Sequence, residues 1–197
     1  MVVIDLDGTL VRGNTFRMFI RHLAKISLKR KKPKVAAGIC VLLALRMAGL
    51  ITHRRMKWYI LRLSDEVMTA RDMKSFAATL PGFFNPQVKA LISGRECVLA
   101  TAAPEEYVAP LAQLLGVDYV ATQRPTNGKY HNFIECRGSY KLRQVEKQWG
   151  KPQDVVTDHA DDLALLAAAT GRRILVHPSA STVATVQLAG IPVEVWA

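Results

Sequence analysis

The feature that most constrains the fold is a short apolar run at the start of the chain that ends abruptly in two carboxylates. Val2-Val3-Ile4 is followed by Asp5-Leu6-Asp7-Gly8-Thr9. Side chains two residues apart on an extended strand point to the same side, so both carboxylates can face one metal ion or one phosphate. Open α/β sheets bind their ligands at such strand ends. A chance turn or a calcium-loop fragment is the alternative that this segment alone leaves open.

Length and composition fit one domain with a sizeable insertion. The chain has 197 residues, half of them apolar, which is enough for a core. The first residues already form the expected strand, so no secretory leader is predicted. Cys40, Cys97 and Cys136 are odd in number and lack metal-ligand spacing. We therefore expect reduced thiols in a cytoplasmic protein.

The net charge of +11 is concentrated in one segment. Between Gly8 and Ser64 there are fourteen Lys and Arg residues and no Asp or Glu. Such a segment should face anions: phosphate groups, acidic lipid headgroups or nucleic acid. The alternative is a basic surface that is exposed to solvent and binds no partner.

The same segment has the apolar spacing of helices. Helices are predicted over 15–28, 35–51, 53–63 and 70–79. The second of these is apolar except for Arg46 and is slightly short for a membrane-spanning helix, so we expect a buried or interfacial helix. The span 13–85 is therefore predicted to be an all-helical insertion.

Strands and helices alternate in the remainder of the chain. Strands are predicted at 97–101, 119–122, 154–157, 174–176 and 193–195, with helices between most of them. Residues 124–137, with Asn127-Gly128 at a turn, are predicted to form a β-hairpin. Repeated strand–helix units imply a parallel sheet covered on both faces. The predicted fold class is α/β, with a Rossmann-like core at 1–12 and 86–197 and a helical cap at 13–85.

Further polar residues follow strands or begin helices. The hydroxyl of Thr101 and the backbone amides from Ala102 onward, at an expected helix start, are suited to a phosphoryl oxygen; a helix cap is the alternative. Lys141, near a helix start, can neutralise a carboxylate and a phosphate. Another apolar strand ends in acids at Asp158, and Asp162 lies four residues further on.

These segments resemble, in their order along the chain, the motifs of the haloacid dehalogenase phosphohydrolases. Asp5-x-Asp7-Gly-Thr is similar to the first motif, and Thr101-Ala-Ala-Pro-Glu-Glu-Tyr resembles the phosphoserine phosphatase-like branch. The resemblance implies that Asp5 attacks phosphorus and becomes an aspartyl-phosphate. It also implies that Asp7 protonates the leaving oxygen and then activates water.

The resemblance further implies a phosphate site and a metal site. Thr101, Ala102 and Lys141 would bind the phosphate. Carboxylates so close together repel unless a cation lies among them, and oxygen ligands favour Mg²⁺ over zinc. The implied metal ligands are Asp5, Asp7 (through its backbone carbonyl) and Asp158, with Asp161 and Asp162 as supporting residues.

The chain departs from the family pattern in three places. Thr157 replaces the usual glycine, His159 occupies a position that is often small, and Asp161 stands where phosphoserine phosphatases carry asparagine. These changes would reshape the floor of the pocket.

The basic segment predicts an anionic substrate. Phosphoserine phosphatases use a carboxylate soon after the first motif to bind the substrate ammonium, whereas here Arg12-Gly13-Asn14-Thr15 occurs and no acid appears before Asp65. A phospholipid headgroup phosphate or a sugar or nucleotide phosphate fits better than phosphoserine. Peripheral contact of the cap with an anionic membrane, at its inner face, is compatible with this pattern. The alternative is a catalytically weak scaffold whose basic cap binds RNA, membrane or a protein, although no nucleic-acid motif is present.

Overall fold

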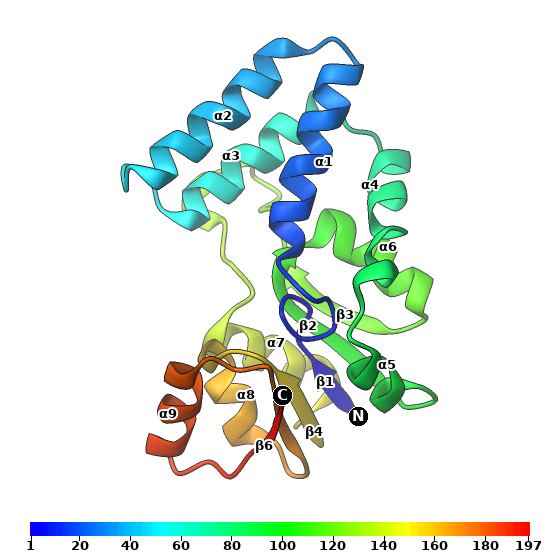
Figure 1. Cartoon of the computed structure of the whole chain (residues 1–197), viewed down its shortest axis with the longest axis vertical. Coiled ribbons are helices and arrows are strands. Elements are labelled where there is room, and N and C mark those ends of the chain that lie inside the picture. Colours follow the sequence, from blue (N-terminus) through cyan, green and yellow to red (C-terminus); the bar gives the residue numbers. More distant parts are fainter.

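One parallel sheet of six strands organises the chain in the computed structural model, which describes residues 1–197 (Figure 1). The strands lie in the order β3-β2-β1-β4-β5-β6. Their bounds are β1 Val2–Ile4, β2 Cys97–Pro104, β3 Asp118–Thr122, β4 Asp154–Thr157, β5 Arg173–Val176 and β6 Glu194–Trp196. This arrangement confirms the predicted α/β class. The strand order reverses between β1 and β4, and ligands bind at such switch points in open α/β sheets.

The central strand β1 is apolar because it is covered on both faces and paired on both edges. Val3 pairs with Val98 of β2 and with Val155 of β4, and all of β1 is buried. Continuous apolar runs are typical of such central parallel strands. This register ends β1 and β4 at one level, so the polar residues that follow them meet at one edge of the sheet.

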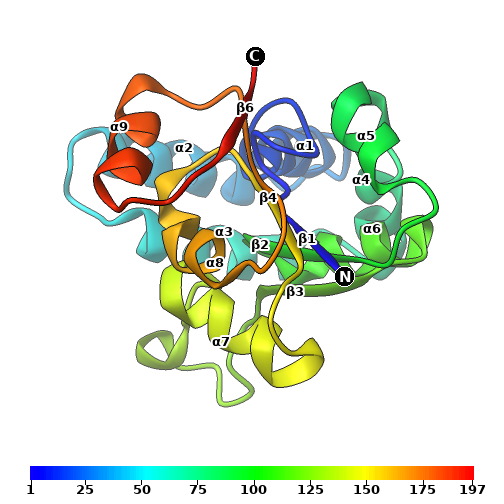
Figure 2. The same ribbon diagram turned by 90° about the horizontal axis from the view of Figure 1, so that it is seen from below.

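Helices cover the two faces of the sheet separately. Figure 2, viewed from below, shows α7, α8 and α9 on one side and α5 and α6 on the other. Their bounds are α5 Pro86–Ile92, α6 Glu105–Leu115, α7 Gly138–Trp149, α8 Leu163–Ala168 and α9 Ala180–Leu188. The apolar core is divided accordingly, and the larger part, on the α6 side, continues into the helices that precede β2.

Four helices lie between β1 and β2, as the apolar spacing predicts. They are α1 Thr15–Lys29, α2 Pro33–Met47, α3 His53–Asp65 and α4 Ala70–Ala77. Helices α1, α2 and α3 stand beyond the carboxyl end of the sheet (Figure 1). Phe16, Phe19 and Leu23 of α1 enter the larger core cluster. None of the helices is both long and apolar enough to cross a membrane. The boundaries of a separate cap at 13 and 85 stay a prediction.

The predicted hairpin at 124–137 is wrong. This segment contains a turn and a short 3₁₀ helix at Tyr130–Asn132, but no strand. It folds against α3 instead of against itself. The ring of Phe133 lies 5.3 Å from that of Trp58, and Arg54 Nε donates to the Phe133 carbonyl at 2.6 Å. The backbone carbonyl of Phe133, which a hairpin would pair with a second strand, thus accepts a hydrogen bond from a side chain of α3.

Helix α5 is absent from the sequence prediction, although its start carries a recognisable signal. Asn85 caps the helix by accepting from the backbone N–H of Gln87 at 3.0 Å, and Pro86 occupies its first turn. Both residue types favour helix starts.

Candidate active site

A cavity of about 230 Å³ lies where the segments after β1 and β4 meet the starts of α1, α3 and α7. All eight residues that the sequence analysis singled out line it. The lining consists of Asp5, Asp7, Asn14, Phe16, His53, Lys57, Thr101, Ala102, Ala103, Glu135, Arg137, Lys141, Asp158, His159, Asp161 and Asp162. The fold therefore brings together residues more than 150 positions apart in the sequence.

The centre of the cavity is a buried lysine held by two carboxylates. Lys141 Nζ lies 2.8 Å from Asp5 Oδ1 and 2.7 Å from Asp162 Oδ1, and its side chain is 3% exposed. The hydroxyl of Thr157 donates to Asp162 Oδ2 at 2.8 Å. Burial lowers the pKa of Lys141, but attraction to Asp162 and Asp5 outweighs it, so the net shift is upward. The ammonium is therefore a fixed positive charge beside Asp5.

The two carboxylates of the first segment have different partners. Whereas Asp5 faces Lys141, Asp7 Oδ1 accepts from the backbone N–H of Thr15, at the start of α1, at 2.6 Å. Burial raises the pKa of Asp7, against the opposing effect of the Thr15 hydrogen bonds. Burial likewise raises the pKa of Asp5, although Lys141 lowers it in part. A carboxyl group with a raised pKa is suited to donate a proton.

Asp158 approaches the first segment so closely that only glycine fits opposite it. A Cβ on Gly8 would lie 2.2 Å from Asp158 Oδ2, and the φ angle of Gly8 is +79°. Both the contact and the left-handed backbone require glycine. Thr9 Oγ1 donates to Asp158 Oδ1 at 3.3 Å. Burial raises the pKa of Asp158, so this carboxylate also lies in surroundings that disfavour its charge.

Thr101 and Ala102 lie on an extended segment, not at a helix start as predicted. Strand β2 runs to Pro104, with an irregular register after Ala100, and α6 begins at Glu105. Thr101 Oγ1 accepts from the backbone N–H of Ala103 at 3.0 Å. After Ala100 the register is irregular and the chain stays extended as far as Pro104. The first backbone amide of α6 is therefore that of Glu105, three residues after Ala102.

The two acids predicted to play supporting roles lie in different places. Asp162 is buried against Lys141, whereas the side chain of Asp161 is 37% exposed at the rim of the cavity. There Asp161 Oδ2 accepts from Arg137 Nε at 2.7 Å and lies 3.0 Å from His159 Nδ1. The two unusual residues of this motif thus form a rim cluster with Arg137.

One residue of the cavity that the sequence analysis missed is Lys57 of α3. Its side chain is 4% exposed, forms an ion pair with Glu135, and donates from Nζ to the Ala102 carbonyl at 2.9 Å. The sequence contained a signal for this residue. Lys57 lies three residues before Ile60 and four before Leu61, a spacing that places it on the apolar face of the helix. A lysine on such a face needs a buried partner.

The other lining residues that the sequence analysis missed come from several elements. They are Asn14, Phe16, His53, Ala103, Glu135 and Arg137. Since α1 and α3 contribute several of them, the helices before β2 form one wall of the cavity.

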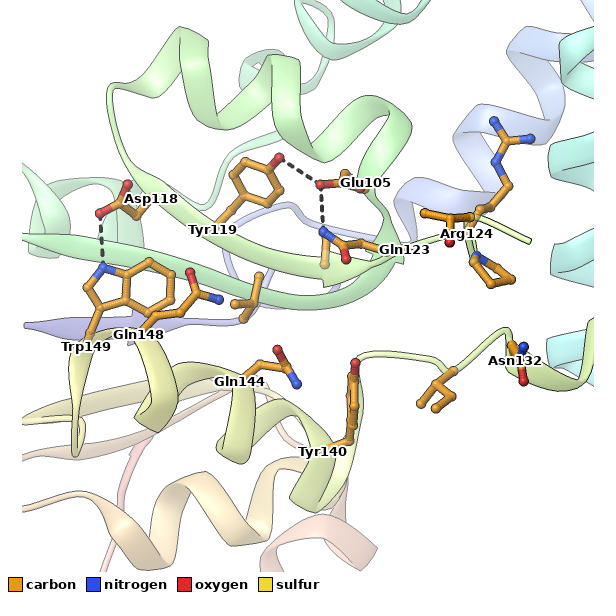
Figure 3. Close-up of a pocket in the computed structure, with 15 residues that line it drawn as sticks. Glu105, Asp118, Tyr119, Gln123, Arg124, Asn132, Tyr140, Gln144, Gln148 and Trp149 are labelled. Atoms are coloured by element: carbon orange, nitrogen blue, oxygen red, sulfur yellow. Dashed lines mark hydrogen bonds between the residues drawn. The ribbon is translucent and has the colours of Figure 1, made fainter. Parts of the chain in front are cut away.

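A second and larger cavity, of about 570 Å³, lies along the free edge of β3 (Figure 3). In it, Tyr119 and Gln123 both donate to Glu105 at 2.9 Å, and Gln144 projects from α7. It contains none of the eight predicted residues and no buried lysine. The chemistry therefore places the candidate active site in the smaller cavity.

The donors around Asp5 fit a magnesium ion better than a softer metal. No three His, Cys, Asp or Glu side chains lie together closely enough to hold a metal by themselves. Two carboxylates, Asp5 and Asp158, nevertheless line the cavity, and the backbone carbonyl of Asp7 follows Asp5 closely in the chain. Oxygen donors completed by water are typical of Mg²⁺, and a cation would offset the burial that raises the pKa of each carboxyl group.

Most of the chain matches one known protein family. A family model described as haloacid dehalogenase-like hydrolase matches residues 2–167. No curated protein matches the sequence.

Several solved structures have a similar fold. A protein of unknown function from Bordetella pertussis Tohama I is 21% identical, with a TM-score of 0.76, and the match covers 100% of this chain and 97% of that one. A phosphoserine phosphohydrolase-like protein from Francisella tularensis is 19% identical, with a TM-score of 0.50 and coverages of 95% and 98%. A probable phosphoserine phosphatase from Vibrio cholerae is 18% identical, with a TM-score of 0.59 and coverages of 94% and 59%.

Proposed function

The chain belongs to the haloacid dehalogenase-like hydrolases, and we propose that it is a Mg²⁺-dependent phosphomonoester hydrolase that acts through an aspartyl-phosphate. One observation carries the proposal: Asp5 and Asp7 line the same cavity as Lys141, which donates a hydrogen bond to Asp5. A carboxylate nucleophile, a second carboxyl group and a fixed cation are the groups that phosphoryl transfer through an aspartate requires.

Asp5 is the proposed nucleophile. One carboxylate oxygen attacks phosphorus while the bond from phosphorus to the leaving oxygen breaks. Lys141 Nζ, 2.8 Å from Asp5, offsets the negative charge that a phosphate brings to the cavity. Asp162 and Thr157 hold this lysine in place. Preorganised positive charge is a large part of what phosphoryl transfer needs.

Asp7 is the proposed acid and base. Its protonated carboxyl group donates the proton to the leaving oxygen, and the product alcohol departs. The resulting carboxylate then takes a proton from a water molecule as that water attacks the phosphorus of the aspartyl-phosphate. Inorganic phosphate leaves, and the carboxylate of Asp5 is restored. The hydrogen bond from the backbone N–H of Thr15 to Asp7 holds the carboxyl group of Asp7 in one orientation for both steps.

A bound Mg²⁺ would be held by the carboxylates of Asp5 and Asp158 and the backbone carbonyl of Asp7, and would supply positive charge opposite the phosphoryl oxygens. Thr101 and Ala102 are the proposed contacts for those oxygens. Asp161 is proposed to support the site from its rim.

The proposed substrate is an anionic phosphate ester. Helices α1 to α4, within 13–85, are proposed to act as a cap. Lys57 and His53 line the cavity from the cap side, and Arg137 lines it from the core side. The acid nearest to Lys57, Glu135, is already paired with it. This wall favours a sugar, nucleotide or lipid phosphate over the ammonium group of phosphoserine.

The test is phosphate release from a panel of monoesters, with Mg²⁺ or with chelator. The panel contains phosphoserine, a hexose phosphate, a nucleoside monophosphate and phosphatidylglycerophosphate. Asp5→Asn should abolish release, and the exposed Asp118→Asn serves as the matched control. Lys57→Gln should raise KM for anionic esters more than it lowers kcat. Metal-independent release, or no release from any ester by the folded protein, would contradict the proposal and leave a binding scaffold as the alternative.

A further inference from the structure

Helix α2 has an apolar outer face that no other part of the chain covers. Of its 15 residues only Val35 and Ile39 are buried. Val41 is 56% exposed and Met47 is 88% exposed, and Leu50, just beyond the helix, is 69% exposed. A surface helix of a globular protein normally has polar residues on its outer side.

Five of the exposed residues of α2 form one apolar stripe. Positions 37, 40, 41, 44 and 47 recur at helical spacing on one side, and they are Ala, Cys, Val, Ala and Met. Val35 and Ile39 face the other way, toward the core of the molecule. Helix α2 packs against α1 and α3 and lies at the end of the molecule opposite the sheet (Figure 1). The stripe is therefore directed outward.

One end of the stripe is bordered by positive charge. Lys31, Lys32 and Lys34 are exposed at the start of α2. Arg46 is exposed near the end of the helix, but by helical spacing it lies on the side of Val35 and Ile39. No acidic residue occurs between Asp7 and Asp65. Two copies of this chain that met through α2 would bring two segments of like net charge together, which is unfavourable. The outer face of α2 is instead complementary to a surface that has an apolar interior and anionic groups at its boundary with water.

We propose that the outer face of α2 docks on the surface of an anionic lipid bilayer. The helix is about 22 Å long at 1.5 Å per residue, which is too short to cross the hydrocarbon layer of about 30 Å, but is sufficient to lie in the plane of the interface. Val41, Met47 and Leu50 enter the outer acyl region, while Lys31 and its neighbours contact lipid phosphates. This docking does not depend on the proposed hydrolysis.

The first experiment is co-sedimentation of the full chain with vesicles. Vesicles of phosphatidylcholine and phosphatidylglycerol at a ratio of about three to one are compared with pure phosphatidylcholine vesicles, since a quarter of anionic lipid gives a negative surface. We expect binding only to the anionic vesicles, and weaker binding at 1 M salt, where exposed charges are screened.

Two sets of variants separate the contributions of charge and apolar contact. The charge variant replaces Lys31, Lys32 and Lys34 with Gln, and its matched control replaces the exposed Lys89, Lys147 and Lys151 with Gln. The apolar variant replaces Val41, Met47 and Leu50 with Gln, and its matched control replaces the exposed Leu114, Leu188 and Val195 with Gln. All these side chains are exposed, so circular dichroism should show an unchanged fold.

Each lysine near an anionic surface contributes about a fivefold effect on affinity, so the charge variant, which loses three, should bind about a hundredfold more weakly. Removing three apolar side chains from the interface should weaken binding by about tenfold or more. Absence of binding to anionic vesicles would overturn the proposal, as would equal losses in the matched controls. Sedimentation equilibrium tests the competing occupant: a dimer that the apolar variant dissociates would assign the face to a second copy.

Discussion

Replacement of Lys141 by Met tests whether the buried charges of the cavity act as one unit. The substitution keeps the length of the side chain but removes the ammonium that contacts both Asp5 and Asp162. The side chain of Asp162 is 4% exposed, so water cannot replace the lost cation. Two carboxylates would then be buried without a counter-charge.

The expected cost follows from distances and burial. At 2.7 to 2.8 Å, the gross attraction of each pair is about 6 kcal/mol at an effective dielectric constant of about 20, and desolvation cancels much of it. Removing one partner of a buried ion pair typically costs about 3–5 kcal/mol. We therefore expect Lys141→Met to lower the free energy of unfolding by that amount at pH 7.

Urea denaturation monitored by circular dichroism measures this change, and a double-mutant cycle with Asp162→Asn isolates the pair. The double variant should lose about 1–3 kcal/mol less than the sum of the single losses, because each single change removes the same interaction. Lys147→Met, an exposed position on the same helix, should change stability by no more than about 0.5 kcal/mol.

Two outcomes would refute this reasoning. A loss below about 1 kcal/mol for Lys141→Met would mean that the cavity is wetter than its burial indicates. Strict additivity in the cycle would mean that Asp162 does not hold Lys141, and its supporting role would be withdrawn.

Three further predictions concern the glycine opposite Asp158, the start of β4 and the metal site. Gly8→Ala should cost about 1–3 kcal/mol by thermal unfolding, because its Cβ meets Asp158, whereas Gly49→Ala, also at positive φ but in open space, should cost less; equal costs would exclude the contact. Arg95 and a backbone N–H lower the pKa of Asp154 despite its burial. Because the folded pKa lies below the unfolded one, Asp154→Asn should cost about 1–3 kcal/mol at pH 7. This cost should shrink as the pH falls below about 4, so a pH-independent difference in urea titrations would contradict it. Mg²⁺ should raise the Tm of the native protein but not of Asp158→Asn, and an equal rise in both would remove Asp158 from the metal site.

Local patterns were sufficient to predict most of the regular structure. The strand at 154–157 was predicted with the bounds that the structure has, and the first helix differs by one residue at its end. Both depend on neighbours in the sequence: an apolar run that ends in polar residues, or apolar positions at helical spacing. The segment 124–137 failed because its backbone bonds to Arg54 of α3, a partner that no local pattern contains.

The sequence by itself determined which residues could share a site. Parallel strands present their carboxyl ends at one edge, so acids placed after apolar runs, such as Asp5 and Asp158, had to converge once the sheet formed. Lys141 was predicted from its place near the start of a helix together with the resemblance to the family's motifs. That reasoning needs the order of elements along the chain and no distance between them.

Only the tertiary structure decided what each side chain contacts. It separated Asp161 from Asp162 and brought Lys57 from a helix into the cavity. It also left one side of α2 uncovered, although the helix is apolar on every side and its sequence gives no direction for burial. Periodicity specifies which residues share a face, but what covers that face depends on packing between elements distant in the sequence.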